Sequence, residues 1–353
     1  MTPAAPSHLP AATPARQRVV SGMRPTGALH LGHYHGALQN WVRLQAAHEC
    51  FYFVADWHAM TTHYRHPQDI EKNVYDMVVD WLGAGVDPER ATLFIQSRLP
   101  EHAELFTLLA MGTPLAWLER VPTYKDRLRN AAGRDLSTIG FLGYPLLQAA
   151  DILIYKAELV PVGEDQAPHV EITREVARRF NHLYGRRGAS PDQRSATLLP
   201  EPATLLTAMS RLPGLDGAKM SKSDNNHIAM RDEPAEVHRK MRRMQTDPAR
   251  VHRSDKGDPD RCPVWQFHRV YSDAPTQAWA MTGCTTAGIG CLDCKQPVID
   301  AIVAQQRPWR ERAEAYLSHP KQVQWIVEVG TERARAVARQ TMREVRTAMG
   351  LTY

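Results

Sequence analysis

The segment from Arg18 to Leu38 constrains the fold of this chain more than any other stretch. It opens with the β-branched pair Val19-Val20, passes through a turn rich in glycine and proline, and then takes on a helical pattern. We therefore expect a strand, a tight turn and the start of a helix. His30 and His33 would share one face of the first helical turn, where a helix N-terminus attracts phosphate. A pair of surface histidines is the simpler alternative.

A second motif, Lys219-Met220-Ser221-Lys222-Ser223, lies far downstream. In this order, the two motifs resemble the ATP-binding signatures of class I aminoacyl-tRNA synthetases. The resemblance implies that Lys219 and Lys222 hold the triphosphate as mobile point charges, while Ser221 and Ser223 add hydroxyl donors. An ordinary solvated lysine is the alternative for any one of these positions.

The resemblance also implies two wider groups of residues at the nucleotide site. The residues expected to act in catalysis are His30, His33, Lys219, Lys222 and Lys125. The residues expected to bind ATP are Arg24, Pro25, Thr26, Gly32, His33, Gly163, Glu164, Asp165, Ala208, Lys219, Met220, Ser221, Lys222 and Ser223.

Alternating apolar runs and helical patterns predict an α/β fold for residues 18–230. Strand-like runs occur at Cys50–Ala55, Leu93–Gln96 and Leu159–Val162, and helical stretches such as Ile70–Gly83 separate them. We expect a Rossmann-like, doubly wound parallel sheet, in which ligands bind beyond the carboxyl ends of the strands. Residues 1–17 are rich in alanine and proline, and we expect a disordered tail there.

The last third of the chain, residues 231–353, is predicted to be an all-helical second domain. Helical patterns cover Pro234–Met244, Cys262–Tyr271, Val298–Tyr316 and Val323–Met349, and the last of these helices is expected to pack back on the first domain. Residues 1–229 contain 23 basic and 23 acidic side chains, so the net charge of +5 arises entirely from the remainder. This asymmetry suits a phosphate-rich partner, and we expect the anticodon region of tRNA to bind there.

Further stretches resemble one branch of the class I family, the bacterial tryptophanyl-tRNA synthetases. They are Phe53–Thr61, Trp117–Asp126, Tyr144–Leu153 and Val160–Gln166, and the resemblance extends over the chain from Arg18 onward. It implies a tryptophan site in which Asp151 accepts the indole N–H and in which Tyr144 and Gln166 hold the ammonium group. The full set implied to bind tryptophan is Asp151, Tyr144, Gln148, Gln166, Val20, Ala55 and His58.

The helix expected to contain Tyr144, Gln148 and Asp151 would present all three on one face, because they occur at i, i+4 and i+7. This Tyr-x3-Gln-x2-Asp face also resembles the archaeal and eukaryotic tyrosyl-tRNA synthetases, so tyrosine is the alternative substrate. The tryptophan branch commonly has Met at Gln148 and an aromatic residue at Val20. The indole pocket is therefore expected to be more polar on one side and roomier on the other.

Four of the five cysteines follow the spacing Cys262-x21-Cys284-x6-Cys291-x2-Cys294, whereas Cys50 lies in an apolar strand. Such a set in a cytosolic chain indicates metal ligation before disulfides, and its spacing fits either zinc or an iron–sulfur cluster. A subset of tryptophanyl-tRNA synthetases carries a [4Fe–4S] cluster on nearly the same spacing, which favours iron–sulfur. A zinc site at His30-x2-His33-x-His35 is disfavoured, because no neighbouring Asp, Glu or Cys completes it.

The resemblance implies a tryptophan–tRNA ligase that uses ATP with Mg²⁺. We expect a cytoplasmic homodimer whose partners are tRNA(Trp), L-tryptophan and ATP, with no membrane association, since no apolar run approaches membrane-spanning length. A tyrosine–tRNA ligase and a non-ligating RNA-binding paralogue remain the alternatives.

Overall fold

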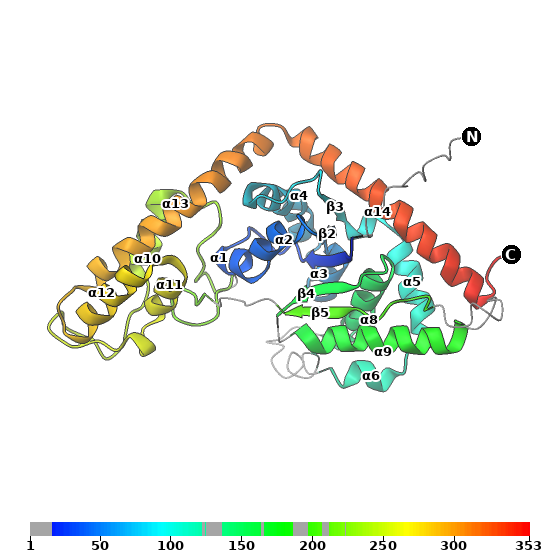
Figure 1. The fold of residues 1–353 in the computed structure, drawn as a ribbon, viewed down its shortest axis with the longest axis horizontal. Helices are drawn as coiled ribbons and strands as arrows, with labels where there is room; N and C mark the ends of the chain where they lie inside the picture. Colours follow the sequence, from blue (N-terminus) through cyan, green and yellow to red (C-terminus); the bar gives the residue numbers. More distant parts are fainter. Residues whose placement is uncertain are drawn as a thin grey trace, which may run out of the picture.

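A single parallel sheet forms the centre of the protein (Figure 1). The structure is a computed structural model that describes residues 16–121, 124, 136–163, 166–185, 197–206, 212–222 and 224–353. The strand order is β3-β2-β1-β4-β5, and neighbouring strands run parallel, which confirms the predicted Rossmann-like sheet. The strands are β1 (Arg18–Met23), β2 (Glu49–Val54), β3 (Ala91–Ile95), β4 (Leu159–Val162) and β5 (Ala203–Leu206).

Helices cover both faces of this sheet. On one face, α4 packs with Val19 and Tyr52, and on the other, α5, α8 and α9 pack with Val20 and Phe51. A central strand covered on both sides needs apolar residues at successive positions, which explains the β-branched pair in β1. The helices of this part are α1 (Leu31–His33), a π-helical turn (Tyr34–Leu38), α2 (Gln39–Leu44), α3 (Asp56–His63), α4 (Gln68–Ala84), a 3-10 turn (Gln96–Arg98), α5 (Glu101–Ala110), α6 (Leu115–Glu119), α8 (Ile139–Leu153) and α9 (Ala167–Tyr184).

The strand register brings the ends of β1, β2 and β3 to one edge of the sheet. Met23 pairs with Val54, and Val54 pairs with Ile95, so the loops that follow the three strands leave the sheet together. Gly22 permits a close approach here, because a Cβ atom at this position would lie 2.6 Å from the Phe53 ring. Ligands of parallel sheets bind at such an edge.

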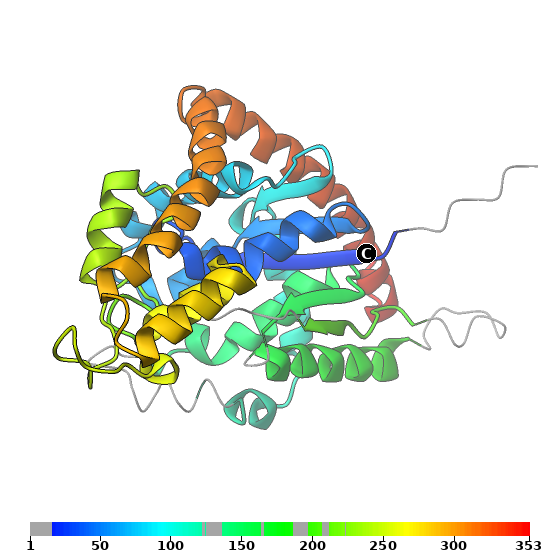
Figure 2. The same ribbon diagram turned by 60° about the vertical axis from the view of Figure 1, so that its left-hand side comes forward.

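The described residues after 230 are helical apart from their connections. The elements are α10 (Pro234–Arg243), a 3-10 turn (Pro259–Arg261), α11 (Pro263–Tyr271), α12 (Ala274–Thr285), α13 (Cys291–Leu317) and α14 (Pro320–Met349). The helix α12 was not predicted, because its sequence has no continuous apolar face. Figures 1 and 2 show α13 and α14 as two long helices joined at an angle, with α10 to α12 along α13 and with α14 along the sheet.

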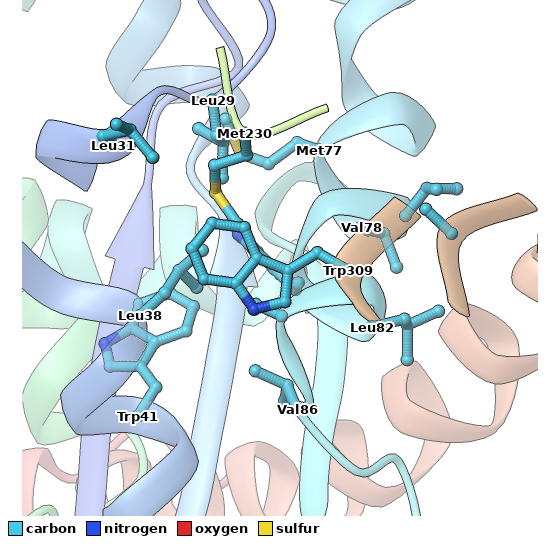
Figure 3. Close-up of a cluster of buried hydrophobic side chains, with 14 of the residues drawn as sticks. Leu29, Leu31, Leu38, Trp41, Met77, Val78, Leu82, Val86, Met230 and Trp309 are labelled. Carbon is cyan, nitrogen blue, oxygen red and sulfur yellow. The ribbon is translucent and has the colours of Figure 1, made fainter. Parts of the chain in front are cut away.

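Both long helices contribute side chains to the cores of the sheet region. Trp309 of α13 lies among Leu29, Met77 and Leu82, next to Met230 (Figure 3). The contact is close, since a Cβ atom on Gly83 would be 3.0 Å from the Trp309 carbonyl oxygen. In the part of the chain that the structure describes, we find no helix with the length and apolar character needed to cross a membrane.

Candidate active site

The two predicted phosphate-binding motifs meet at the carboxyl end of β1. The Lys222 ammonium donates to the Gly27 carbonyl oxygen at 2.8 Å, although the two residues are 195 positions apart. Gly27 has φ +114°, and its Cα faces the Lys222 side chain, so a side chain at this position would be strained and crowded. The loop of the first motif and the lysine loop therefore form one site.

The two histidines of the first motif lie in contact within this site. Their ring centroids are 3.7 Å apart, and the backbone N–H of His30 donates to Nδ1 of His33 at 3.2 Å. Burial, together with Lys222, His227 and Lys219, lowers the pKa of His30 to about 3. Burial and His30 likewise hold the pKa of His33 well below its usual value. Both rings are therefore uncharged at neutral pH, and they offer hydrogen bonds rather than positive charges.

Lys222 supplies the charge that these histidines lack. Burial and, to a smaller extent, Arg24 lower its pKa to about 8, against the opposing effect of Asp80. Asp80 is 2% exposed, accepts the Leu29 N–H at 3.0 Å and binds Arg231 at 2.6 Å. It was missed in the sequence, because a lone acid within an apolar helix face gives no signal of a contact with a distant turn.

Asn226 holds the lysine loop in shape. Its Oδ1 accepts the Ser221 N–H at 2.7 Å, while its Nδ2 donates to Asp216 at 2.8 Å and to the Lys219 carbonyl at 3.1 Å. At Gly214, a Cβ atom would be 2.3 Å from Asn226 Nδ2, so only glycine fits there. The backbone of the loop is thus fixed while the lysine side chains remain adjustable.

A cavity of about 180 Å³ opens next to this site. Its lining residues are Arg24, Phe53, Ala55, His58, Thr61, Phe141, Tyr144, Gln148, Asp151, Gln166 and His169. Tyr144, Gln148 and Asp151 come from one face of α8, as the spacing predicted. Phe53, Thr61, Phe141 and His169 were not predicted. Phe53, Thr61 and His169 reach the cavity because β2, α3 and α9 pack around α8, whereas Phe141 lies on α8 itself, three residues before Tyr144.

Asp151 lines the cavity and is 1% exposed. Burial alone would raise its pKa, but hydrogen bonds from His102 and His58 outweigh burial and hold the pKa below its usual value. The carboxylate is ionised at neutral pH and can only accept hydrogen bonds. It is therefore suited to a donor such as an indole N–H.

At the opposite wall, Tyr144, His169 and Gln166 form a chain. Nδ1 of His169 lies 2.9 Å from Gln166 Oε1, and Nε2 lies 3.0 Å from the Tyr144 hydroxyl. Because the amide oxygen can only accept, Nδ1 carries the proton and the tyrosine hydroxyl donates to Nε2. The oxygen atoms of Tyr144 and Gln166 are hydrogen-bond acceptors, which is the chemistry that an ammonium group requires.

Most of the predicted site residues lie around these two connected regions. Val20 is an exception, since it is 1% exposed and packs in the core with Phe51 and Phe53 instead of lining the cavity. The roomier pocket expected at this position stays a prediction. The structure places Pro25, Thr26 and Gly32 in the segment between β1 and the π-helical turn, Met220 in the lysine loop, and Gly163 directly after β4. Lys125, Glu164, Asp165, Ala208 and Ser223 lie outside the described residues, as do residues 1–15 of the expected tail.

The four spaced cysteines gather where α11, α12 and α13 begin or end. Burial, together with the charges of Cys262, Cys284 and Cys291, raises the pKa of Cys294 to about 12. Within the described ranges, however, no three His, Cys, Asp or Glu side chains are arranged so that they could hold a metal ion. His35, from the alternative histidine site, instead contacts the Tyr271 hydroxyl through Nε2 at 2.8 Å.

Comparison with known proteins identifies the class. A family model described as tRNA synthetases class I (W and Y) matches residues 13–305, and the chain belongs to this family. Within it, the chain is 56% identical to the tryptophan–tRNA ligase of Ralstonia nicotianae, over 96% of this chain and 99% of that protein. It is 49% identical to the tryptophan–tRNA ligase of Thermotoga maritima, over 95% of this chain and all of that protein.

A solved structure agrees with this placement. The tryptophanyl-tRNA synthetase of Campylobacter jejuni, crystallised with ADP and tryptophan, superimposes with a TM-score of 0.81 at 30% identity. The match covers 95% of this chain and 100% of that chain. The shared architecture therefore includes the C-terminal helices as well as the sheet.

Proposed function

We infer that this protein is a tryptophan–tRNA ligase. It activates L-tryptophan with ATP to tryptophanyl-adenylate and pyrophosphate, and it then transfers the tryptophanyl group to the terminal ribose of tRNA(Trp). The observation that carries this inference is a cavity lined by the ionised Asp151, beside a turn faced by Lys222. The extensive identity with tryptophan–tRNA ligases supports it.

The substrate supplies its own nucleophile, because the carboxylate of tryptophan attacks the α-phosphate of ATP. The protein must therefore align two anions and stabilise the negative charge that develops on the phosphate oxygens. Lys222 and Lys219 supply positive charge, while the uncharged His30 and His33 supply hydrogen bonds. Mg²⁺ would accompany the triphosphate as a hard cation bound by oxygen. Lys125 and Ser223 complete the proposed nucleotide contacts.

Tyrosine remains the alternative amino acid, because Tyr144, Gln148 and Asp151 also suit a phenol. ATP–pyrophosphate exchange with each amino acid separates the two. We expect exchange with tryptophan to exceed exchange with tyrosine by roughly 10³-fold or more, since a cavity shaped for an indole holds a phenol in poor register with Asp151. Equal exchange with both would contradict tryptophan specificity, and the absence of exchange with either would leave the RNA-binding paralogue.

We further propose that Cys262, Cys284, Cys291 and Cys294 hold a [4Fe–4S] cluster. Four cysteines at α11, α12 and α13, helices that pack together, are the kind of donor set that such a cluster takes. Binding would require deprotonation of the thiols, which the raised pKa of Cys294 opposes. It would also require the four thiols to lie closer together. The cluster would stabilise the helical region, and zinc is the alternative occupant.

Anaerobically purified protein tests this assignment. We expect brown protein with about four irons per chain, and we expect Cys291→Ser to bleach it and lower its melting temperature. ATP–pyrophosphate exchange should largely survive, because none of the four cysteines is among the residues proposed to bind ATP or tryptophan. A colourless protein with one zinc per chain would reject iron–sulfur.

Residues 231–353 are proposed to bind the anticodon region of tRNA, because the excess positive charge of the chain lies there. We further propose that the protein is a cytoplasmic homodimer. Sedimentation of the purified protein would test the dimer, and a single species at the 39.8 kDa mass of one chain would contradict it.

A further inference from the structure

A buried network lies behind Asp151, on the side away from the cavity. His102 of α5 is 0% exposed, and its Nδ1 lies 2.6 Å from Asp151 Oδ1. Its Nε2 lies 2.7 Å from the hydroxyl of Tyr155, which is also 0% exposed. Neither residue is among those that line the cavity, so neither can touch a substrate held there.

The proton positions in this network follow from its chemistry. The ionised Asp151 can only accept, so Nδ1 of His102 carries a proton. Burial and the nearby Asp151 raise the pKa of Tyr155 well above its usual value, so its hydroxyl keeps its proton. With the histidine proton on Nδ1, the hydroxyl donates to Nε2. Tyr155 thus fixes the orientation of the ring, and the ring fixes Asp151.

Gln96 restrains the same carboxylate from a third direction. It is 0% exposed, and its Nε2 donates to both oxygens of Asp151, at 2.8 and 3.0 Å. Its Oε1 is buried without a hydrogen-bond partner among the described residues. Reversal of the amide would direct this oxygen at a carboxylate, so the observed orientation is the only one that bonds.

The contacts with Asp151 come from the protein interior and from the cavity wall. His102 and Gln96 bond the carboxylate from the interior, and His58 binds Oδ2 at 2.7 Å from the wall. Asp151 itself lines the cavity, and because an ionised carboxylate can only accept, a ligand there can bond it only by donating.

We propose that His102, oriented by Tyr155, is a positioning residue that determines substrate specificity by keeping Asp151 an acceptor directed at the cavity. The enzyme thereby selects a side chain that carries an N–H group over one of the same shape that lacks it. This inference rests on the proposed tryptophan–tRNA ligase function. It assigns the selection to residues that never contact the substrate.

The test uses an isostere of tryptophan in which sulfur replaces the indole N–H, β-(benzothiophen-3-yl)alanine. The measured quantity is the ratio of kcat/KM for tryptophan to kcat/KM for the isostere, in ATP–pyrophosphate exchange. We expect His102→Gln, which places its amide near Nε2 and not Nδ1, to lower this ratio about 10- to 100-fold. His102→Asn keeps an N–H at the position of Nδ1, and it should restore the ratio to within about threefold of wild type. The KM for ATP should change in neither variant.

Tyr155→Phe provides a second test that does not depend on the stability of His102→Gln. Loss of the hydroxyl frees the ring to rotate, and we expect the ratio to fall about three- to tenfold with an unchanged KM for ATP. A wild-type ratio in both His102→Gln and Tyr155→Phe would overturn the inference while leaving the proposed function intact. A wild-type enzyme that shows no tryptophan-dependent exchange would instead overturn the proposed function, and this inference with it.

Discussion

The two ends of the active site differ in how completely their polar groups are bonded. At Asp151, donors from three directions bond the carboxylate, and a buried tyrosine fixes one of these donors. At the nucleotide end, Nδ1 of His30 and Nδ1 of His227 are buried without partners within the described part of the chain. Lys222 is held at a lowered pKa. The carboxylate at one end is bonded by protein donors before its ligand arrives, whereas two ring nitrogens at the other end can still be bonded by a ligand.

This contrast matches the tasks of the two ends. Selection of one amino acid requires an acceptor whose position does not adjust to a wrong substrate. Phosphoryl chemistry requires charges that strengthen their contacts as the transition state forms, and adjustable lysines above a fixed loop meet that requirement. Variants at the two ends should therefore affect different kinetic constants.

Asp151→Asn should have the largest effect. The neutral amide presents an N–H₂ group to the surrounding donors, so the carboxylate loses its match to both the network and the substrate. We expect kcat/KM for tryptophan to fall by up to roughly 10⁴–10⁵, with little change in the KM for ATP. Steady-state exchange kinetics would measure both constants. A wild-type KM for tryptophan in this variant would show that Asp151 does not accept the indole N–H.

Lys222→Ala should affect the nucleotide end of the site. Its charge is needed mainly where negative charge develops on phosphate, so we expect kcat for adenylate formation to fall roughly 10²–10³-fold with little change in tryptophan binding. Lys72→Ala is the matched control, because Lys72 is an exposed lysine paired with Asp69 on α4. An unchanged exchange rate in Lys222→Ala would remove this lysine from the mechanism.

Asn226→Ala should have a smaller effect on the same end. The loop loses an acceptor for Ser221 and donors to Asp216 and Lys219, so its lysines become less well placed. We expect the KM for ATP to rise about tenfold, with the KM for tryptophan unchanged. If the KM for tryptophan rose by the same factor, the two ends would not be separable.

Lys222→Met tests the nucleotide end through the stability of the protein measured without ligand. Folding lowers the pKa of Lys222 from 10.5 to about 8, so the charged form destabilises the fold. This destabilisation is full below pH 8, declines as the pH rises from 8 to 10.5, and is absent above 10.5. After allowance for solvent screening, we expect Lys222→Met to be more stable than wild type by about 1 kcal/mol at pH 7. Urea unfolding at pH 7 and pH 10.5 measures this difference, and a gap that persisted at the higher pH would exclude the charge as its cause.

The strand pattern and the paired motifs were sufficient to predict the Rossmann-like sheet and the helical C-terminal part. Alternating periodicity marks the elements, and Tyr144, Gln148 and Asp151 share a helix, so spacing alone puts them on one face. His102 and Tyr155 could not be found in this way. Each looks like a core residue of its own element, and their chemistry depends on how α5 packs against α8.

Val20 shows what a resemblance between families can and cannot predict. Both faces of β1 are buried, and Val20 lies on the same side as the cavity-lining Phe53 and Ala55. The resemblance therefore indicates the face of the strand, whereas contact of this side chain with the amino acid stays a prediction.

The return of α14 to the sheet has a consequence for how this enzyme is made. A Cβ atom at Gly330 would lie 1.9 Å from the Leu93 carbonyl oxygen, so the helix backbone rests directly on β3. Ala334, Ala338, Met342 and Val345 complete the same core as Phe53 and Ala55 of the amino-acid cavity. The ribosome synthesises these residues after all five strands of the sheet. A translation product that stopped before α14 would therefore contain the strands but lack part of the core beneath the substrate cavity, so it would not be a smaller working enzyme.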